Sequence, residues 1–330
     1  MKTKEPPCTG RYARWCERSG KLFNFPSYSI LYIKLFLGVV LLAKIGLVDV
    51  DGHRFPSIPL MKLSAYHKSL GDQVEWYQPL FHSMGEPLDM VYMSKVFSFT
   101  PDFEYYVNAN KVVKGGSGYS IKTVDGREVY DKSKDHDLPY EIEHIYPDYE
   151  LYGIMDTAYG FLSRGCPRGC NFCHVGTKEG LCSYKVADLS EFWRGQKNIV
   201  LCDPNILACR NWKELLQQLI DSRAYVDINQ GFDIRLMTEE QAEMVKRMKI
   251  RNLHFSWDRY EDKDIVVPKL KMFKEITGFD IRRLIVYVLC NYNTTFEQDL
   301  ERIYTLRDLG YWSYVMLYGK EHIPKGHKLR

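Results

Sequence analysis

The sequence lacks both a strong net charge and a long uninterrupted apolar segment. Its 45 Lys and Arg residues nearly balance 42 Asp and Glu residues, leaving a formal net charge of +3. So small a charge gives no electrostatic argument for binding DNA. The apolar stretch from Ser29 to Ala43 is interrupted by Lys34 and is shorter than the roughly 20 residues that a membrane-spanning helix needs. Neither DNA nor a membrane is therefore expected as a partner, unless this stretch is a genuine anchor.

The cysteines lack the regular spacing of a secreted disulfide framework. There are nine of them in 330 residues, at irregular intervals, and such usage is typical of reduced thiols in a cytoplasmic protein. The composition, 45% hydrophobic and 26% charged, is that of a soluble globular chain long enough for about two domains. We therefore expect a cytoplasmic protein with two folded parts.

One compact cluster of thiols stands apart from the other cysteines. In the stretch from Gly165 to His174, Cys166, Cys170 and Cys173 form the pattern CxxxCxxC. Thiolates held this close together select zinc, Cu(I) or iron–sulfur clusters. A structural zinc site uses four protein ligands, whereas a site that performs chemistry leaves one metal position open. Three neighbouring cysteines therefore favour a metal site with an open position.

This pattern, with Phe172 just before the last cysteine, resembles the signature of the radical S-adenosylmethionine (SAM) superfamily. The resemblance implies that Cys166, Cys170 and Cys173 bind a [4Fe-4S] cluster whose fourth iron is chelated by SAM. It further implies that an electron donor such as flavodoxin or ferredoxin reduces the cluster, and that SAM is cleaved to a 5'-deoxyadenosyl radical that abstracts hydrogen from a substrate. Phe172 would lie against the adenine. The alternative is a non-catalytic structural zinc or iron–sulfur module, closed by His174 or a distant cysteine, or simply three core thiols.

Residues 1–43 differ in pattern from the rest of the chain. They are basic at first and then apolar, and the first strand-like segment begins only at Lys44. We expect the functional protein to begin near Ala43. The preceding residues are then either an anchor or an upstream extension of the reading frame.

Residues 44–117 alternate strand-like and helix-like patterns, which predicts a Rossmann-like, doubly wound domain. A helix is missing between its second and third strands. The expected strands are Lys44–Val50, Val74–Tyr77, Met90–Val96 and Lys111–Lys114, and the expected helices are Ile58–Ser69, ended by Gly71, and Pro101–Ala109.

Polar residues and glycines follow the strands of this first domain, where ligands of parallel sheets bind. Asp51, His53, Ser94 and the pair Gly115-Gly116 resemble, in order and spacing, the pattern of cobalamin-binding domains. The resemblance implies cobalamin as a further cofactor, with the histidine as the lower cobalt ligand and the glycines beside its nucleotide tail. Departures from the pattern, such as Pro56 in place of a glycine, leave open a degenerate domain without the corrinoid.

Residues 118–152 are expected to be a linker with one hairpin at Val124-Asp125-Gly126-Arg127. Residues 153–330 repeat strand and helix patterns six times, which predicts a (β/α)6 partial TIM barrel, the fold that the resemblance also implies. The expected strands are Ala158–Leu162, Asn198–Cys202, Val226–Asn229, Asn252–Ser256, Leu284–Leu289 and Ser313–Leu317. The expected helices are Trp212–Asp221, Thr238–Met248, Pro268–Ile276 and Thr294–Leu309, with capping boxes at Thr238/Gln241 and Thr294/Glu297, and with Gly278 and Gly310 after helix ends.

Chemistry in such barrels gathers at the carboxyl ends of the strands. The candidates there are Asp203, Asn205, Gln230, Asp233, Arg235, Trp257, Asp258, Asn291, Asn293 and Tyr318, each of which could equally be a turn or capping residue. We assign Asp203 to the amino group of SAM and Arg235 to its carboxylate, because a guanidinium matches a carboxylate in geometry and charge. A salt bridge of Arg235 with Asp233 or Glu239 is the alternative. Asn291 is a further candidate for binding SAM.

The remaining cysteines, Cys182, Cys202, Cys209 and Cys290, are expected to be core thiols. Cys290 is also a catalytic candidate, because it ends the fifth core strand, where it could donate a hydrogen atom. His174 is expected to pack or to form a hydrogen bond. The charged residues 320–330 are expected to be a solvated tail, and without an evident RNA-binding module a tRNA substrate is disfavoured. The substrate, a small molecule, a peptide or an RNA, is not specified by the sequence.

Overall fold

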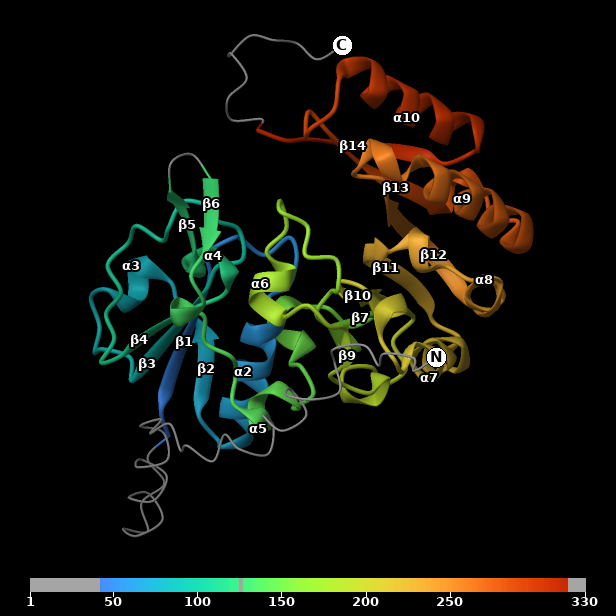
Figure 1. Cartoon of the computed structure of the whole chain (residues 1–330). Coiled ribbons are helices and arrows are strands. Elements are labelled where there is room, and N and C mark those ends of the chain that lie inside the picture. Colours follow the sequence, from blue (N-terminus) through green and yellow to red (C-terminus); the bar gives the residue numbers. More distant parts are fainter. Residues whose placement is uncertain (1–41, 125–126, 320–330) are drawn as a thin grey trace, which may run out of the picture. The chain divides into compact units, whose positions relative to one another are not determined.

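The computed structural model describes residues 42–124 and 127–319 (Figure 1). Most of the extension 1–43, the centre of the predicted hairpin turn and the charged tail lie outside these ranges. The described residues form two compact units, one made of 42–48, 67–93 and 103–114, and the other of 49–66, 94–102 and 115–319. Within these residues no helix combines the length and the apolar character needed to cross a bilayer.

The first sheet has four strands in the order β2-β1-β3-β4. These are β1 (Lys44–Asp49), β2 (Gln73–Trp76), β3 (Met90–Ser94) and β4 (Val112–Gly115), close to the predicted ranges. Strands β1 and β2 are parallel, and Ile45 and Leu47 of β1 are buried because these positions are apolar. Gly46 lies between them, and a Cβ there would be 2.7 Å from Leu88 Cδ1, so this strand position has no room for a side chain.

Helix α2 (Ile58–Ser69) has the predicted bounds and ends before Gly71, whose φ of +84° suits glycine. The predicted helix Pro101–Ala109 is wrong, because this segment is irregular. Its backbone is bound elsewhere: Asn108 N donates to Tyr77 Oη over 2.9 Å, and the carbonyl of Asn108 accepts from Leu88 N. Between β2 and β3 there is only the short helix α3 (Pro79–His82), in agreement with the predicted missing helix.

The segment after β4 contains short elements. Strands β5 (Ile121–Val124) and β6 (Arg127–Tyr130) pair antiparallel, which confirms the predicted hairpin. Helices α4 (Ser117–Ser120) and α5 (Tyr140–Glu143) are single turns on either side of it.

The second sheet contains six parallel strands, and all six predicted core strands are present. They are β7 (Thr157–Gly160), β10 (Asn198–Leu201), β11 (Tyr225–Phe232), β12 (Lys249–Ser256), β13 (Leu284–Cys290) and β14 (Trp312–Leu317), which are neighbours in chain order. The short strands β8 (Ser163–Arg164) and β9 (Tyr184–Lys185) and helix α6 (Val175–Glu179) lie between β7 and β10 in the chain. The chain is therefore a mixed α/β protein with parallel pairing.

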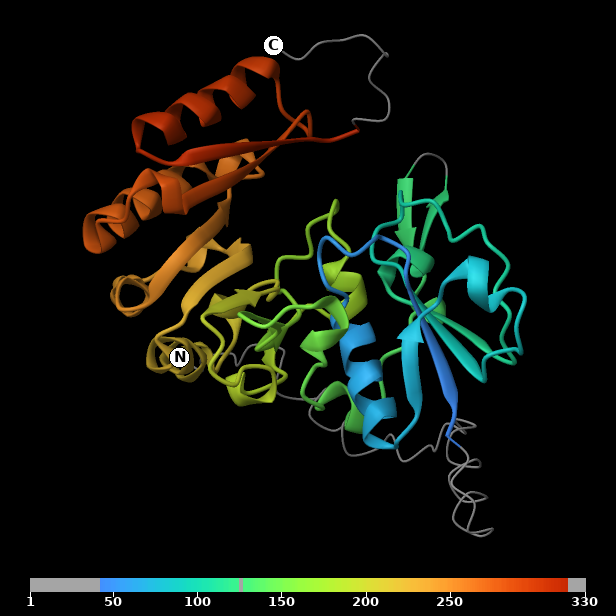
Figure 2. The same cartoon turned by 180° about the vertical axis from the view of Figure 1, so that it is seen from behind.

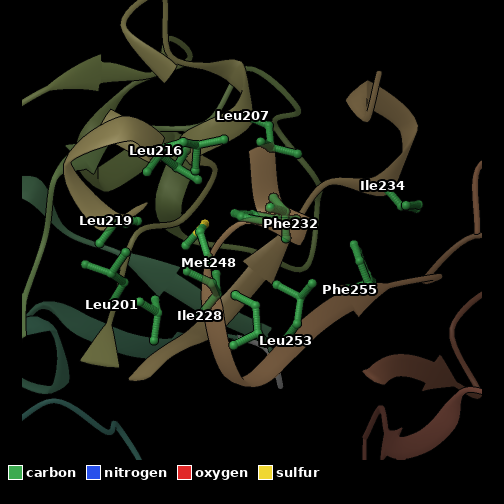
Figure 3. Packing of buried hydrophobic residues seen from close by; sticks show 14 of the residues in the cluster. Leu201, Leu207, Leu216, Leu219, Ile228, Phe232, Ile234, Met248, Leu253 and Phe255 are labelled. Carbon is green, nitrogen blue, oxygen red and sulfur yellow. The ribbon is translucent and has the colours of Figure 1, made fainter. Parts of the chain in front are cut away.

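Four longer helices connect the strands, namely α7 (Trp212–Ser222), α8 (Glu239–Lys246), α9 (Lys263–Thr277) and α10 (Phe296–Asp308). They lie along one side of the sheet (Figures 1 and 2). Apolar side chains from that side of the sheet and from the helices form one buried cluster, part of which is drawn in Figure 3. Leu216, Ile228 and Leu253 in this cluster are fully buried.

The helix ends agree with the predictions in three cases and differ in two others. The capping box Thr238/Gln241 is confirmed, Gly278 caps α9 in the left-handed conformation, and Gly310, with a φ of +75°, follows the end of α10. The second box is formed by Thr295 and Gln298, one residue later than predicted, because the hydroxyl of Thr294 donates to Asp299 instead. Helix α9 begins before the predicted Pro268, at Lys263, which lets the helix bury Val266 as well.

Candidate functional site

The loop that carries the three cysteines is closed by its own backbone. It starts after β8, which pairs antiparallel with β9, and Cys166 N donates to the carbonyl of Gly180. Gly165 has a φ of +80°, and a Cβ there would lie 2.0 Å from the carbonyl oxygen of Cys182. Glu179 accepts hydrogen bonds from Gly165 N and from the guanidinium of Arg164. The loop is thus held at both ends before any ligand is considered.

One of the three thiols, that of Cys166, lies beside a buried amide. Cys166 and Cys170 are half-buried and Cys173 is exposed. Asn205, which follows β10 and is only 2% exposed, directs its Nδ2 to Cys166 Sγ over 3.4 Å, while its Oδ1 is buried without a hydrogen-bond partner. Among the residues that the structure describes, no three His, Cys, Asp or Glu side chains are arranged to hold a metal ion.

Three thiols are ligands that fit an iron–sulfur cluster, although in the described residues they are not arranged around a common metal position. Burial raises the pKa of the Cys170 thiol, and the neighbouring Cys173 raises it further. Without a metal this thiol is therefore protonated at neutral pH, and a soft metal would have to displace its proton on binding. Soft thiols on a backbone-closed loop are the ligands that such clusters use.

A chain of ion pairs ties the cysteine loop to the carboxyl end of β11. Arg168, from within the CxxxCxxC pattern, donates to Asp233 Oδ2, while Arg235 Nε donates to Asp233 Oδ1 over 2.8 Å. Arg235 also reaches Asp262 over 2.7 Å. Burial opposes the charge of Arg235, but the two carboxylates outweigh it and raise the pKa of the guanidinium. The salt bridge of Arg235 with Asp233 is thus present, and a role in binding the carboxylate of SAM stays a prediction.

Asp203 is fully buried beneath the same loop. Its Oδ1 accepts from Leu162 N over 3.0 Å, and its Oδ2 accepts from the hydroxyl of Ser163 over 2.6 Å. The carboxylate therefore joins the end of β10 to the start of the loop, and both oxygens are occupied by the chain. Its assignment to the amino group of SAM stays a prediction.

Asp203 should give the protein a measurable pH dependence. Burial raises its pKa to about 6 although Ser163 and Leu162 donate to it. The folded state therefore binds this proton more tightly than the unfolded state, and stability is gained as pH falls from about 6 to about 4. Relative to Asp203→Asn, the free energy of unfolding of the wild type should rise by about 2–3 kcal/mol over this range. Urea unfolding of both proteins from pH 7 to pH 4 measures this difference, and parallel curves would contradict it.

Aromatic rings connect the cysteine loop to the ends of the last two strands. Phe172 packs edge-on against Tyr292, with ring centroids 5.1 Å apart, and Tyr292 packs against Tyr318 at 4.8 Å. Asn291, with a φ of +63°, donates from Nδ2 to the carbonyl of Tyr318. Tyr292 was missed by sequence reasoning, although both of its neighbours were candidates. Its only signal is its position in the turn after a strand.

The end of β13 is held by a buried arginine that sequence reasoning also missed. Arg302 of α10 is 0% exposed and donates to the carbonyls of Trp257 and Leu289 and to Asp299 Oδ1. Burial and, to a smaller extent, the charge of Asp299 raise the pKa of Cys290 to about 11, so this thiol stays protonated. Cys290 is buried, as expected of a core thiol, and a role in hydrogen donation stays a prediction.

The remaining candidates lie in different surroundings. Asp258 has a buried Oδ1 without a partner, and burial raises the pKa of this carboxyl. Trp257 is buried and donates from Nε1 to the carbonyl of Arg259. Gln230 and Asn293 are exposed. The structure thus brings Asn205 to the cysteine loop directly, and Asp233 and Arg235 through Arg168.

The prediction of core thiols holds for Cys202 and Cys209 but not for Cys182, and the prediction for His174 is confirmed. Cys202 and Cys209 are buried, as expected of core thiols, whereas Cys182 is half-buried. His174 Nε2 lies 3.3 Å from Glu128 Oε2, so it makes a hydrogen bond as expected.

The residues expected to bind cobalamin are largely engaged by the chain itself. Asp51 accepts from Val96 N and from the hydroxyl of Thr100, and His53 packs edge-on against Tyr152. The buried hydroxyl of Ser94 accepts from Ser57 Oγ over 2.9 Å. A Cβ at Gly116 would lie 2.3 Å from the carbonyl oxygen of Lys95, whereas one at Gly115 would have open space. The fit to a corrinoid is thus limited to Gly115, and we derive no step through cobalamin.

Comparison with models of known protein families finds no match to this chain, and comparison with curated proteins finds no significant match either.

Proposed function

We propose that this protein is a radical SAM enzyme in which Cys166, Cys170 and Cys173 bind a [4Fe-4S] cluster. The observation that carries the proposal is the position of these thiols, on a backbone-closed loop after the first strand of a six-stranded parallel sheet. Strands in chain order with helices along one side are the arrangement expected of a (β/α)6 partial barrel. We assign the first sheet, in the same way, to a Rossmann-like domain.

The chain's own residues have distinct roles in this proposal. When bound, a reduced cluster would supply the one electron that cleaves SAM into methionine and the 5'-deoxyadenosyl radical. Arg168 and Asp233 hold the cysteine loop against the end of β11. Asn205 places an amide next to Cys166, where it donates to the sulfur and lowers its electron density. Phe172, with Tyr292 behind it, offers an apolar ring against which the adenine stacks and from which water is excluded.

The experiment that tests the proposal is anaerobic reconstitution of the purified protein with iron and sulfide. We expect the absorption of a cubane cluster and, after reduction in the presence of SAM, release of 5'-deoxyadenosine. A reduced flavodoxin or ferredoxin should replace the chemical reductant. Stoichiometric zinc without SAM cleavage would instead show a structural metal module and overturn the proposal.

Corrinoid content tests the cobalamin prediction separately from the cysteine site. Because the fit to a corrinoid is limited to Gly115, we expect hydrogen abstraction followed by rearrangement or sulfur insertion. A corrinoid retained by the purified protein, seen in its visible absorption, would contradict this and return methyl transfer to carbon as the predicted reaction. The substrate class, small molecule, peptide or RNA, is not fixed by the cysteine site.

A further inference from the structure

The two faces of the six-stranded sheet differ in chemistry. Side chains alternate between the faces along each strand, and positions paired in register share a face. Val226, Leu253 and Val286 are all 0% exposed and belong to the buried apolar cluster that the sheet shares with α7–α10. On the opposite face, Asp227 is paired in register with Asn252, and Tyr287 with Tyr314. Parallel strands buried on both sides are apolar on both sides, so this second face is not an ordinary core face.

The polar and aromatic residues of this second face come from five of the strands. They are Tyr159 of β7, Asp227 of β11, Asn252 and His254 of β12, Tyr287 of β13 and Tyr314 of β14. We call these six residues the polar sheet face. It lies within the larger of the two units and includes none of the cysteines.

Asp227 is a carboxylate with one unsatisfied oxygen. Its Oδ2 accepts from Asn252 Nδ2 over 2.7 Å, but its Oδ1 is buried and lacks a hydrogen-bond partner. Within the described residues, its nearest potential cation is His254, whose Nδ1 lies 3.7 Å from Oδ1. A buried acceptor without a donor is costly, and a ligand that supplies a donor removes this cost.

His254 offers a second acceptor beside Asp227. Its Nδ1 lies 2.8 Å from the carbonyl oxygen of Ile228, and since a carbonyl only accepts, Nδ1 carries the proton. In the neutral ring, Nε2 is then an acceptor. The imidazole lies flat on Tyr287, with centroids 5.1 Å apart and an interplanar angle of 6°, which fixes its orientation.

Aromatic rings complete the surroundings of these two acceptors. The hydroxyl of Tyr287 donates to the carbonyl of Asn229, so it is not available to a ligand as a donor. The ring of Tyr314 packs edge-on against Tyr287, at 5.6 Å, and is exposed. A carboxylate that accepts hydrogen bonds, next to the faces of aromatic rings, is the combination that recognises an organic ammonium ion.

We propose that the polar sheet face binds a ligand through a primary ammonium group, which donates to Asp227 and His254 while its carbon skeleton packs on Tyr287 and Tyr314. As the substrate class of the enzyme, an amine, the inference rests on the proposed radical SAM function. As a binding site it does not, because neither iron nor SAM takes part.

The test uses benzylamine as the probe and the full-length protein without iron. Benzylamine carries an ammonium group and one aromatic ring, and benzyl alcohol is its neutral counterpart. We expect saturable changes in the NMR signals of 13C-labelled His and Tyr rings, assigned to His254 and Tyr287 through His254→Gln and Tyr287→Phe, with benzylamine but not with the alcohol. Asp227→Asn should weaken binding at least about tenfold, because it removes a charge-assisted hydrogen bond.

Matched controls separate a specific site from a general charge effect. Asp221→Asn, on α7, removes an exposed carboxylate and should leave benzylamine binding unchanged. If Asp227→Asn does not fold, His254→Gln replaces it, with weaker binding again expected. Equal binding of the alcohol, unchanged binding in the folded variant, or no binding of benzylamine to the wild type would each overturn the proposal. None of these outcomes depends on SAM cleavage, so failure of the radical SAM function is distinguished from failure of the amine site.

Discussion

Replacing Cys170 with alanine is expected to abolish SAM cleavage and to prevent assembly of a [4Fe-4S] cluster. The reason is that two remaining thiols cannot supply the three ligands that such a cluster needs when SAM occupies its fourth iron. The half-buried side chain is small and the loop is closed by backbone hydrogen bonds, so folding should persist. Iron and sulfide per chain, together with 5'-deoxyadenosine formed on reduction, measure the effect.

Cys182→Ala is the matched control for this prediction. Cys182 is also half-buried and follows the same loop, but it lies outside the CxxxCxxC pattern. This variant should bind as much iron as the wild type and cleave SAM at a similar rate. If Cys170→Ala retained its cluster and its activity, the ligand assignment would be refuted.

Replacing Arg302 with leucine is expected to destabilise the protein by about 3–5 kcal/mol, because it leaves the largely buried charge of Asp299 without its partner. The carbonyls of Trp257 and Leu289 lose their donor as well. Trp257 directly follows β12, and Leu289 lies one residue before the end of β13. The turns after these strands, which carry Asp258 and Asn291, should therefore loosen. Urea unfolding measures the loss of stability.

Arg307→Leu, on the same helix, provides the comparison. Arg307 also pairs with an aspartate, Asp308, but both side chains are 67% exposed. A pair this open to water contributes little, so the free energy of unfolding should hardly change. Equal destabilisation by the two substitutions would show that loss of an arginine from α10, rather than burial of the charge, is what matters.

The regular parts of the fold could be predicted because they follow local patterns. Apolar runs at strand and helix spacing located β10 to β14 and α7 to α10, and Thr238 with Gln241 marked a helix start. The helix predicted at Pro101–Ala109 failed because tertiary hydrogen bonds to Tyr77 and Leu88 hold this segment in an irregular conformation. Local sequence does not contain those partners.

In the candidate site, too, the parts that follow a local pattern could be predicted and the others could not. Strand ends placed Asp233 and Arg235 near the cysteine loop, because the carboxyl ends of parallel strands meet at one edge. The link between them is Arg168, which pairs with a residue 65 positions away in the sequence. This pair has no local pattern. Arg302 pairs locally with Asp299, at i,i+3, but its contacts with the carbonyls of Trp257 and Leu289 depend on how distant segments pack.

The closure of the cysteine loop bears on how a metal would be acquired. In zinc fingers the metal and the fold form together, so removing the metal unfolds the domain. Here β8 and β9, the Gly180 carbonyl and Glu179 already hold the loop without metal. If the proposed cluster is bound, its uptake would follow folding of this loop, and a chelator should then remove the iron without unfolding the protein.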